Sequence, residues 1–274
     1  MKLFINSTKS VVTFNKQDYL LRAAERLGLD NVLPLENELN PMCVLNVEPY
    51  DKFIRGTKWT GIWEIDLLCD RAETNLSDWL VANKVFIAVS KYSSRLNGAA
   101  HKTELLFQAI DPQIHKRIES IPQEYDFVCC GSLGLDIYKE RERLINLLKK
   151  EFSCNNYGKG HNPYVYIQNL NHAKVQFIRS MNTQIADGEL AQRFFECLAI
   201  GPVLTNYVDD LKETKLKEGV DYLSYRNDEE LLEKMNRLID NKTYADYIAE
   251  NGRKKALELH TYDLRLQHIL KDLI

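Results

Sequence analysis

Arg193 and Glu196 stand three residues apart in a stretch that predicts a helix, so their side chains share one helical face. Gly201 and Pro202 end that helix, and the apolar run at 203–205 predicts a buried strand. A guanidinium can fork onto phosphate oxygens, and a carboxylate can accept hydrogen bonds from ribose hydroxyls. The pair therefore indicates a nucleotide diphosphate site, and a solvated surface ion pair is the competing interpretation.

A glycine turn supplies the second candidate for phosphate binding. Gly131, Ser132 and Leu133 lie between a predicted strand at 125–130 and a predicted helix at 138–151. Backbone N–H groups in such a turn can approach phosphate oxygens, although similar turns also close ordinary strand–helix connections. Together with Arg193, the turn could neutralise a leaving diphosphate without a divalent ion. The Asp-x-Asp motif that would hold a metal is absent from the sequence, so no metal site is predicted.

Three further residues follow the carboxyl end of the predicted strand at 203–205, where open α/β sheets bind ligands. Thr205, Asn206 and Tyr207 are therefore candidate phosphate or sugar contacts. Tyr166, in a predicted helix at 163–170, could stack on a nucleobase; a buried aromatic is the alternative.

A general base is sought in the first half of the chain. Asp66 follows an aromatic-rich predicted strand and is the preferred candidate. Glu64 and Asp70 are the second-ranked candidates. Carboxylates at strand ends in a cleft often have shifted pKa values, which suits proton abstraction. A helix N-cap or a solvated loop acid is the alternative for each. His115, near the expected domain linker, is expected at the surface.

Composition excludes several classes of protein. The 274 residues carry 36 basic and 39 acidic side chains, so no strong overall field favours nucleic acid or anionic lipid. Six cysteines without a C-x-x-C motif indicate reduced thiols rather than metal ligands. No signal peptide and no membrane span are predicted, and a cytoplasmic protein is expected.

Strand and helix patterns alternate throughout the chain, which indicates an α/β fold with mainly parallel sheets. The alternation breaks at 121–124 and then restarts. Two Rossmann-like domains are therefore predicted, at 1–121 and 122–274.

Five blocks, in this order and spacing, resemble the C-terminal domain of GT-B glycosyltransferases. They are 127–132, 138–141, 193–205, 218–222 with 228–231, and 260–265. The resemblance is closest to the group 1 (family 4-like) enzymes and to their CgeB-like branch. Family 4 enzymes usually carry two glutamates flanking seven residues. Glu196 matches the second, whereas the first falls on Gly188, with Glu189 one place away. The CgeB-like branch tolerates this and has an arginine three residues before the glutamate, which Arg193 supplies.

The resemblance implies a GT-B architecture: two Rossmann-like domains face each other across a cleft, and the C-terminal helices cross back. It implies a metal-independent hexosyl- or pentosyltransferase that takes a sugar from a nucleotide diphosphate, with a UDP-sugar favoured and no further cofactor. The donor would lie on 122–274 and the acceptor on 1–121. Arg193 would serve catalysis as well as binding.

Several alternatives stay open. The domain could be a catalytically silent GT-B binding or assembly module, or a GT-B nucleotide-sugar epimerase. The acceptor could be a glycan, a small metabolite or a hydroxymethylated base in DNA, although the balanced charge of the first half argues against a DNA-binding rim. Either a monomer or a homodimer is compatible with the sequence.

Overall fold

The computed structural model describes residues 2–7, 16–35, 41–47, 56, 58–64, 82–88, 103–157, 163–191 and 193–273. The chain divides into two compact units. Unit 1 comprises Met1–Asp111 and Tyr262–Ile274, and unit 2 comprises Pro112–Thr261. No helix among the described residues is both long and apolar enough to span a membrane.

The division falls after Asp111, whereas the sequence placed it after residue 121. The intervening segment is held by unit 2: the Ile118 N–H donates to Oδ1 of Asn171 (2.8 Å), and Nδ2 of Asn171 donates to the Lys116 carbonyl (3.2 Å). Asn171 is fully buried, so these hydrogen bonds fix the backbone of the segment.

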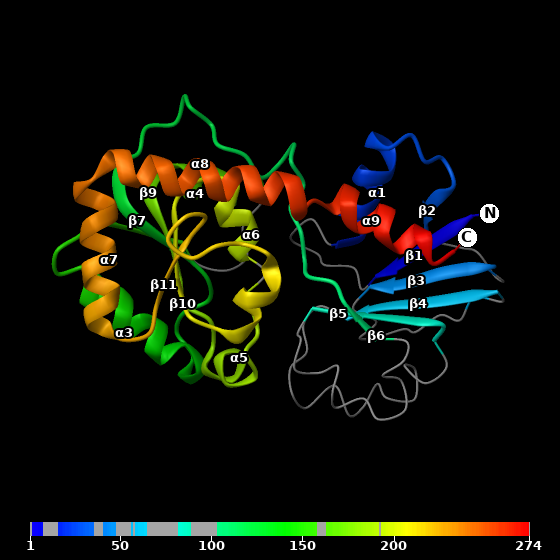
Figure 1. Cartoon of the computed structure of the whole chain (residues 1–274), viewed down its shortest axis with the longest axis horizontal. Coiled ribbons are helices and arrows are strands. Elements are labelled where there is room, and N and C mark those ends of the chain that lie inside the picture. Colours follow the sequence, from blue (N-terminus) through cyan, green and yellow to red (C-terminus); the bar gives the residue numbers. More distant parts are fainter. Residues whose placement is uncertain are drawn as a thin grey trace. The chain divides into compact units, whose positions relative to one another are not determined.

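The described part of unit 1 contains a six-stranded parallel sheet in the order β2-β1-β3-β4-β5-β6 (Figure 1). Its strands are β1 (Leu3–Ser7), β2 (Val32–Pro34), β3 (Cys43–Val47), β4 (Trp59–Glu64), β5 (Lys84–Ile87) and β6 (Thr103–Leu105). Its helices are α1 (Lys16–Arg26) and α9 (Tyr262–Lys271). All five residues of β3 are buried, as expected for a strand in a parallel sheet covered on both faces.

Helix α9 belongs to unit 1 because its first turn is bound there by aromatic and ionic contacts. The ring of Tyr262 stacks on Tyr19, with centroids 4.9 Å apart. Arg26 donates from Nη2 to Asp263 (2.7 Å) and from Nη1 to Asp111 (3.1 Å). Asp111 is fully buried, so it requires such a partner. The expected return of the chain from the second unit to the first is confirmed.

Unit 2 contains a five-stranded parallel sheet in the order β11-β10-β9-β7-β8. Its strands are β7 (Tyr125–Cys130), β8 (Cys154–Tyr157), β9 (Ala173–Ile178), β10 (Val203–Asn206) and β11 (Leu223–Tyr225). Its α-helices are α3 (Lys139–Leu148), α4 (Pro163–Asn171), α5 (Asn182–Asp187), α6 (Arg193–Leu198), α7 (Asp228–Asp240) and α8 (Lys242–Leu259). The 3-10 helices are η3 (Asp136–Tyr138) and η4 (Asp209–Thr214).

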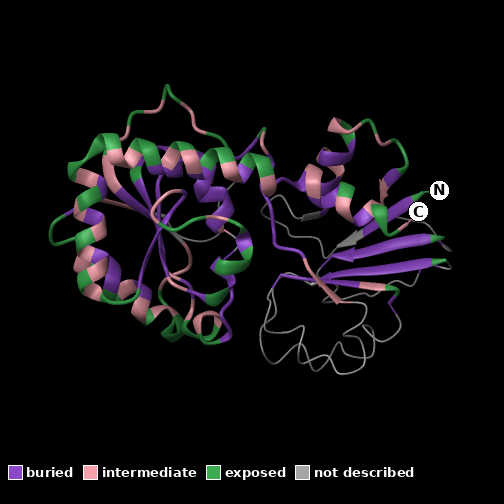
Figure 2. Ribbon diagram, in the orientation of Figure 1, coloured by how far each residue is buried: buried purple, intermediate pink, exposed green. Residues whose placement is uncertain are grey.

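The two faces of this sheet are covered by different helices. Phe127, Val175 and Leu204 point to one face and form an apolar cluster with α3 and α7. Alternate residues point to the other face. Helices α4 and α6 contact β7, β9 and β10 there, as right-handed crossovers require. The strands are buried along most of their length, while the helices keep an exposed outer side (Figure 2).

All strands of unit 2 are parallel, so their carboxyl ends lie at one edge of the sheet. From β7 the chain passes to β8 on one side and then to β9 on the other side of β7. The carboxyl ends of β7 and β9 therefore flank a topological switch point, where open α/β sheets bind ligands. The loops that begin at Gly131 and at Arg179 lie at this point.

Candidate functional site

Two guanidinium groups meet beside Gly131, at the carboxyl end of β7. A Cβ atom on Gly131 would overlap Nη1 of Arg193 and would lie 2.7 Å from Nη1 of Arg141. Arg141 lies on α3 and Arg193 begins α6, so the two arginines come from helices on opposite faces of the sheet. A glycine leaves room for both side chains, and any larger residue would displace them.

Arg141 is buried, with 2% of its surface exposed. Its Nε donates to the Arg179 carbonyl (2.8 Å) and its Nη1 to the Ser132 carbonyl (2.8 Å). Burial, and then the neighbouring charge of Arg193, lower the pKa of Arg141 to about 10, so it still carries its charge at neutral pH. Two positive charges held this close form a site for an anion.

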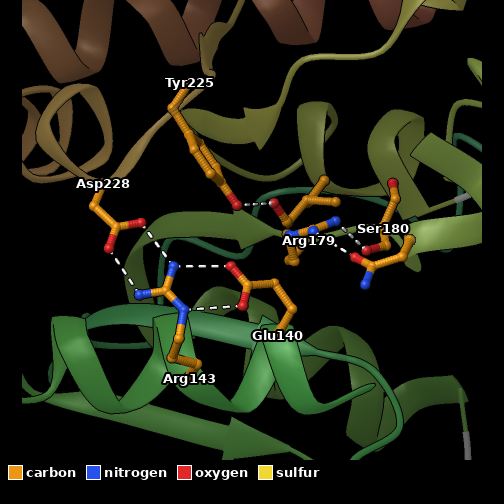
Figure 3. A network of polar contacts seen from close by, with 8 residues as sticks. Glu140, Arg143, Arg179, Ser180, Tyr225 and Asp228 are labelled. Carbon is orange, nitrogen blue, oxygen red and sulfur yellow. Dashed lines mark hydrogen bonds and ion pairs between the residues drawn. The ribbon is translucent and has the colours of Figure 1, made fainter. Parts of the chain in front are cut away.

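A third arginine lies at the switch point, directly after β9. Arg179 donates from Nη1 to the Ser180 carbonyl (2.6 Å), as Figure 3 shows. It also donates from Nη2 to Oδ1 of Asn182 (2.8 Å). Burial lowers its pKa. The Ser180 N–H donates to Oδ1 of Asn206 (2.7 Å), which joins the loops after β9 and β10.

A forked ion pair holds helix α3 in place. Arg143 contacts both oxygens of Glu140 (2.8 and 2.9 Å) and both oxygens of Asp228 (2.7 and 2.8 Å), as seen in Figure 3. Asp228 begins α7, so the pair links the first turn of α7 to α3, the helix that carries Arg141. This geometry is the bidentate arrangement in which an arginine fixes two carboxylates most firmly.

Glu196 lies one helical turn after Arg193. It is 8% exposed, so the competing interpretation of a solvated surface carboxylate does not describe it. Its Oε2 accepts a hydrogen bond from the Tyr166 hydroxyl (2.8 Å), and its Oε1 lies 3.7 Å from Nε2 of His115. Side chains three apart on a helix are roughly 5–6 Å apart at Cβ, which suits a diphosphate on Arg193 and its ribose on Glu196.

The structure places His115 differently from the sequence-based expectation. Its exposed fraction is 2%, because the segment after Asp111 is packed against α4 and α6 rather than lying on the surface. The prediction of a surface histidine was wrong. Tyr166, a candidate for stacking on a nucleobase, is half-buried and donates its hydroxyl to Glu196.

The residues predicted after β10 reach the expected edge of the sheet. Thr205 is buried, and its hydroxyl donates to the Asn206 carbonyl (3.2 Å). Asn206 holds the backbone of Ser180, as described above. Tyr207 donates from its hydroxyl to Asp209 (3.1 Å), and the guanidinium of Arg226 lies 4.2 Å from its ring centroid.

Three predicted residues remain: Ser132 and Leu133 in the loop after β7, and Asp66 in the first half of the chain. Ser132 offers its carbonyl to Arg141, and Leu133 packs against the apolar cluster of unit 2. Asp66 lies outside the described residues. Among the described residues, no group of three His, Cys, Asp or Glu side chains is arranged to hold a metal ion.

Sequence reasoning missed the roles of Arg141 and Arg179. Arg179 directly follows strand β9. Thr205 was selected because open α/β sheets bind ligands at the carboxyl ends of their strands, and the same argument could have selected Arg179. Arg141 lies in the block at 138–141 that resembles the GT-B enzymes, but its approach to Gly131 depends on the tertiary packing of α3.

Comparison with known proteins is consistent with this geometry. The family model described as "Glycosyl transferase-like" matches residues 112–271. No curated protein matches the chain in sequence.

Solved structures match over the whole chain. Alr3699/HepE from Anabaena, crystallised with UDP and glucose, has a TM-score of 0.68 at 14% identity, covering 99% of this chain and 98% of that one. Sucrose-phosphate synthase (tll1590) from Thermosynechococcus elongatus has a TM-score of 0.64 at 12% identity, with coverages of 100% and 99%. A glycosyltransferase from Rickettsia africae has a TM-score of 0.60 at 12% identity, with coverages of 98% and 97%. The chain therefore belongs to the glycosyl transferase-like family and is a glycosyltransferase with the GT-B fold.

Proposed function

We propose that this glycosyltransferase moves a sugar from a nucleotide diphosphate to an acceptor hydroxyl without a metal ion. The observation that carries the proposal is the pair of guanidinium groups of Arg141 and Arg193 beside Gly131, with Glu196 one helical turn away. HepE has also been crystallised with UDP-glucose, which supports a UDP-sugar as the donor.

Different residues near the switch point are proposed to bind the diphosphate and the ribose of the donor. When the sugar leaves, negative charge develops on the diphosphate, and charged donors already fixed in place stabilise it. Arg141 and Arg193 supply this charge, and the turn at Gly131 and Ser132 brings its backbone N–H groups close. Diphosphate binding also relieves the repulsion between the two arginines. Glu196 accepts hydrogen bonds from the ribose hydroxyls.

The acceptor is proposed to bind the first half of the chain, with Asp66 as the general base that takes the proton of the attacking hydroxyl. The acceptor hydroxyl would belong to a glycan, a small molecule or a hydroxymethylated DNA base. The balanced net charge of the chain gives no preference for the last of these.

Calorimetric titration with UDP tests the donor site. Arg193→Ala should weaken UDP binding by roughly 10- to 100-fold, since a charge-assisted contact to phosphate is lost. Arg237→Ala is the matched control: Arg237 is exposed on α7 and lies over the ring of Tyr244 (3.8 Å). The Arg237→Ala variant should bind UDP with the affinity of the wild type. Equal affinities in Arg193→Ala and Arg237→Ala would contradict the proposal.

Measuring UDP release with and without an acceptor distinguishes the proposed transferase from a silent binding module and from an epimerase. UDP release from UDP-glucose should depend on an acceptor, whereas an epimerase would convert the sugar without one. In the same assay Asp66→Asn should retain UDP affinity and lose roughly 100-fold or more in transfer rate.

A further inference from the structure

The carboxylate of Glu196 is held by side chains from two other segments. Tyr166 on α4 donates its hydroxyl to Oε2 at 2.8 Å, and His115 places Nε2 3.7 Å from Oε1. The second distance is too long for a hydrogen bond, but the buried imidazole restricts the space around Oε1. A free glutamate side chain would rotate about several bonds, and a ligand that binds it must offset the conformational entropy lost on ordering it.

The hydrogen bond from Tyr166 uses one acceptor site of a group that offers about four. The Glu196 side chain as a whole is 11% exposed, so it is largely enclosed and its carboxylate keeps acceptor capacity beyond the bond from Tyr166. A carboxylate fixed in this way presents its oxygens to a ligand in one orientation. Arg193, on the same face of α6, fixes where the phosphates of that ligand lie.

We infer that Tyr166 is a positioning residue that holds the carboxylate of Glu196 in the orientation in which it accepts the ribose hydroxyls of the donor. The inference rests on the proposed donor site. A ribose supplies hydroxyl donors to the oriented carboxylate. A sugar without those hydroxyls leaves a desolvated carboxylate short of hydrogen bonds, and sites built to bind a hydroxyl reject ligands that lack it.

The test compares UDP with 2′,3′-dideoxy-UDP by calorimetric titration of the full chain. Tyr166→Phe keeps the ring and removes the hydroxyl. It should weaken UDP binding by roughly three- to tenfold and leave the affinity for the dideoxy nucleotide within about twofold. Tyr164→Phe is the matched control, because Tyr164 lies on the same helix with 58% of its surface exposed. It should change neither affinity.

A double variant checks that Tyr166 acts through Glu196. In a Glu196→Ala background, Tyr166→Phe should cause no further loss of UDP affinity, because the carboxylate that it orients is gone. Equal losses for both nucleotides in Tyr166→Phe would show a structural role and overturn the inference. Unchanged UDP affinity in Tyr166→Phe would also overturn it while leaving the donor site intact. Failure of the wild type to bind UDP would instead reject the proposed function together with the inference.

Discussion

At the residue scale, the site depends on Gly131 having no side chain. The guanidinium of Arg193 occupies the place of a Cβ atom, and Arg141 approaches the same place from the other face of the sheet. The sequence predicted Arg193, Glu196 and Gly131 as site residues because helical spacing and turn chemistry are local properties. It could not predict that Arg141 completes the pair, since that contact depends on how α3 packs against the sheet.

Gly131→Ala should therefore displace the arginine pair. UDP affinity is expected to fall by roughly tenfold or more, because a methyl group would take the space of Nη1 of Arg193. Calorimetric titration measures the loss. Gly219→Ala is the control, since Gly219 has a φ of +79° and open space around its Cβ position. That change should lower stability by about 1 kcal/mol through backbone strain and leave UDP affinity unchanged. Wild-type affinity in Gly131→Ala would show that the arginines do not bind the diphosphate.

At the scale of elements, the sequence predicted strands β7 and β10 and helices α3, α4 and α6. It missed β8, whose residues Cys154–Tyr157 read CNNY and carry no apolar run. It also missed β2, which has three residues. Such strands form because a neighbouring strand offers backbone hydrogen bonds, and a local pattern does not show that neighbour.

The link between α3 and α7 gives a pH-dependent prediction. Hydrogen bonds from Arg143 lower the pKa of both Glu140 and Asp228. A carboxylate with a lowered pKa stabilises the fold above its unfolded pKa, and this stability is lost as the pH falls through the folded value. Arg143 is 48% exposed, so solvent screens the pair and its contribution is small.

Arg143→Ala should lower the free energy of unfolding by about 1 kcal/mol at pH 7, and by less near pH 3, because this stability is lost as the pH falls through the lowered pKa values of the two carboxylates. Urea titration at the two pH values measures the difference. Arg237→Ala removes a cation–π contact with the Tyr244 ring and no ion pair with a carboxylate is involved in that contact, so its effect should be the same at both pH values. An equal cost of Arg143→Ala at both pH values would rule out the ion pairs as the cause.

At the scale of the whole molecule, alternating strands and helices predicted two Rossmann-like units, and the structure confirms this. The sequence placed the boundary too late in the chain because 112–121 has no regular pattern. The buried side chain of Asn171, distant in sequence, assigns that segment to unit 2. Donor binding is accordingly proposed for residues of unit 2 alone, which supplies both Arg141 and Arg193.

A crystal structure of the chain with UDP tests the central claim most directly. We predict that the diphosphate lies beside Gly131, with phosphate oxygens about 2.7–2.9 Å from the guanidinium nitrogens of Arg141 and Arg193. The ribose hydroxyls should lie within hydrogen-bond distance of Glu196. A diphosphate bound away from the carboxyl ends of β7 and β9, with both arginines turned from it, would contradict the account.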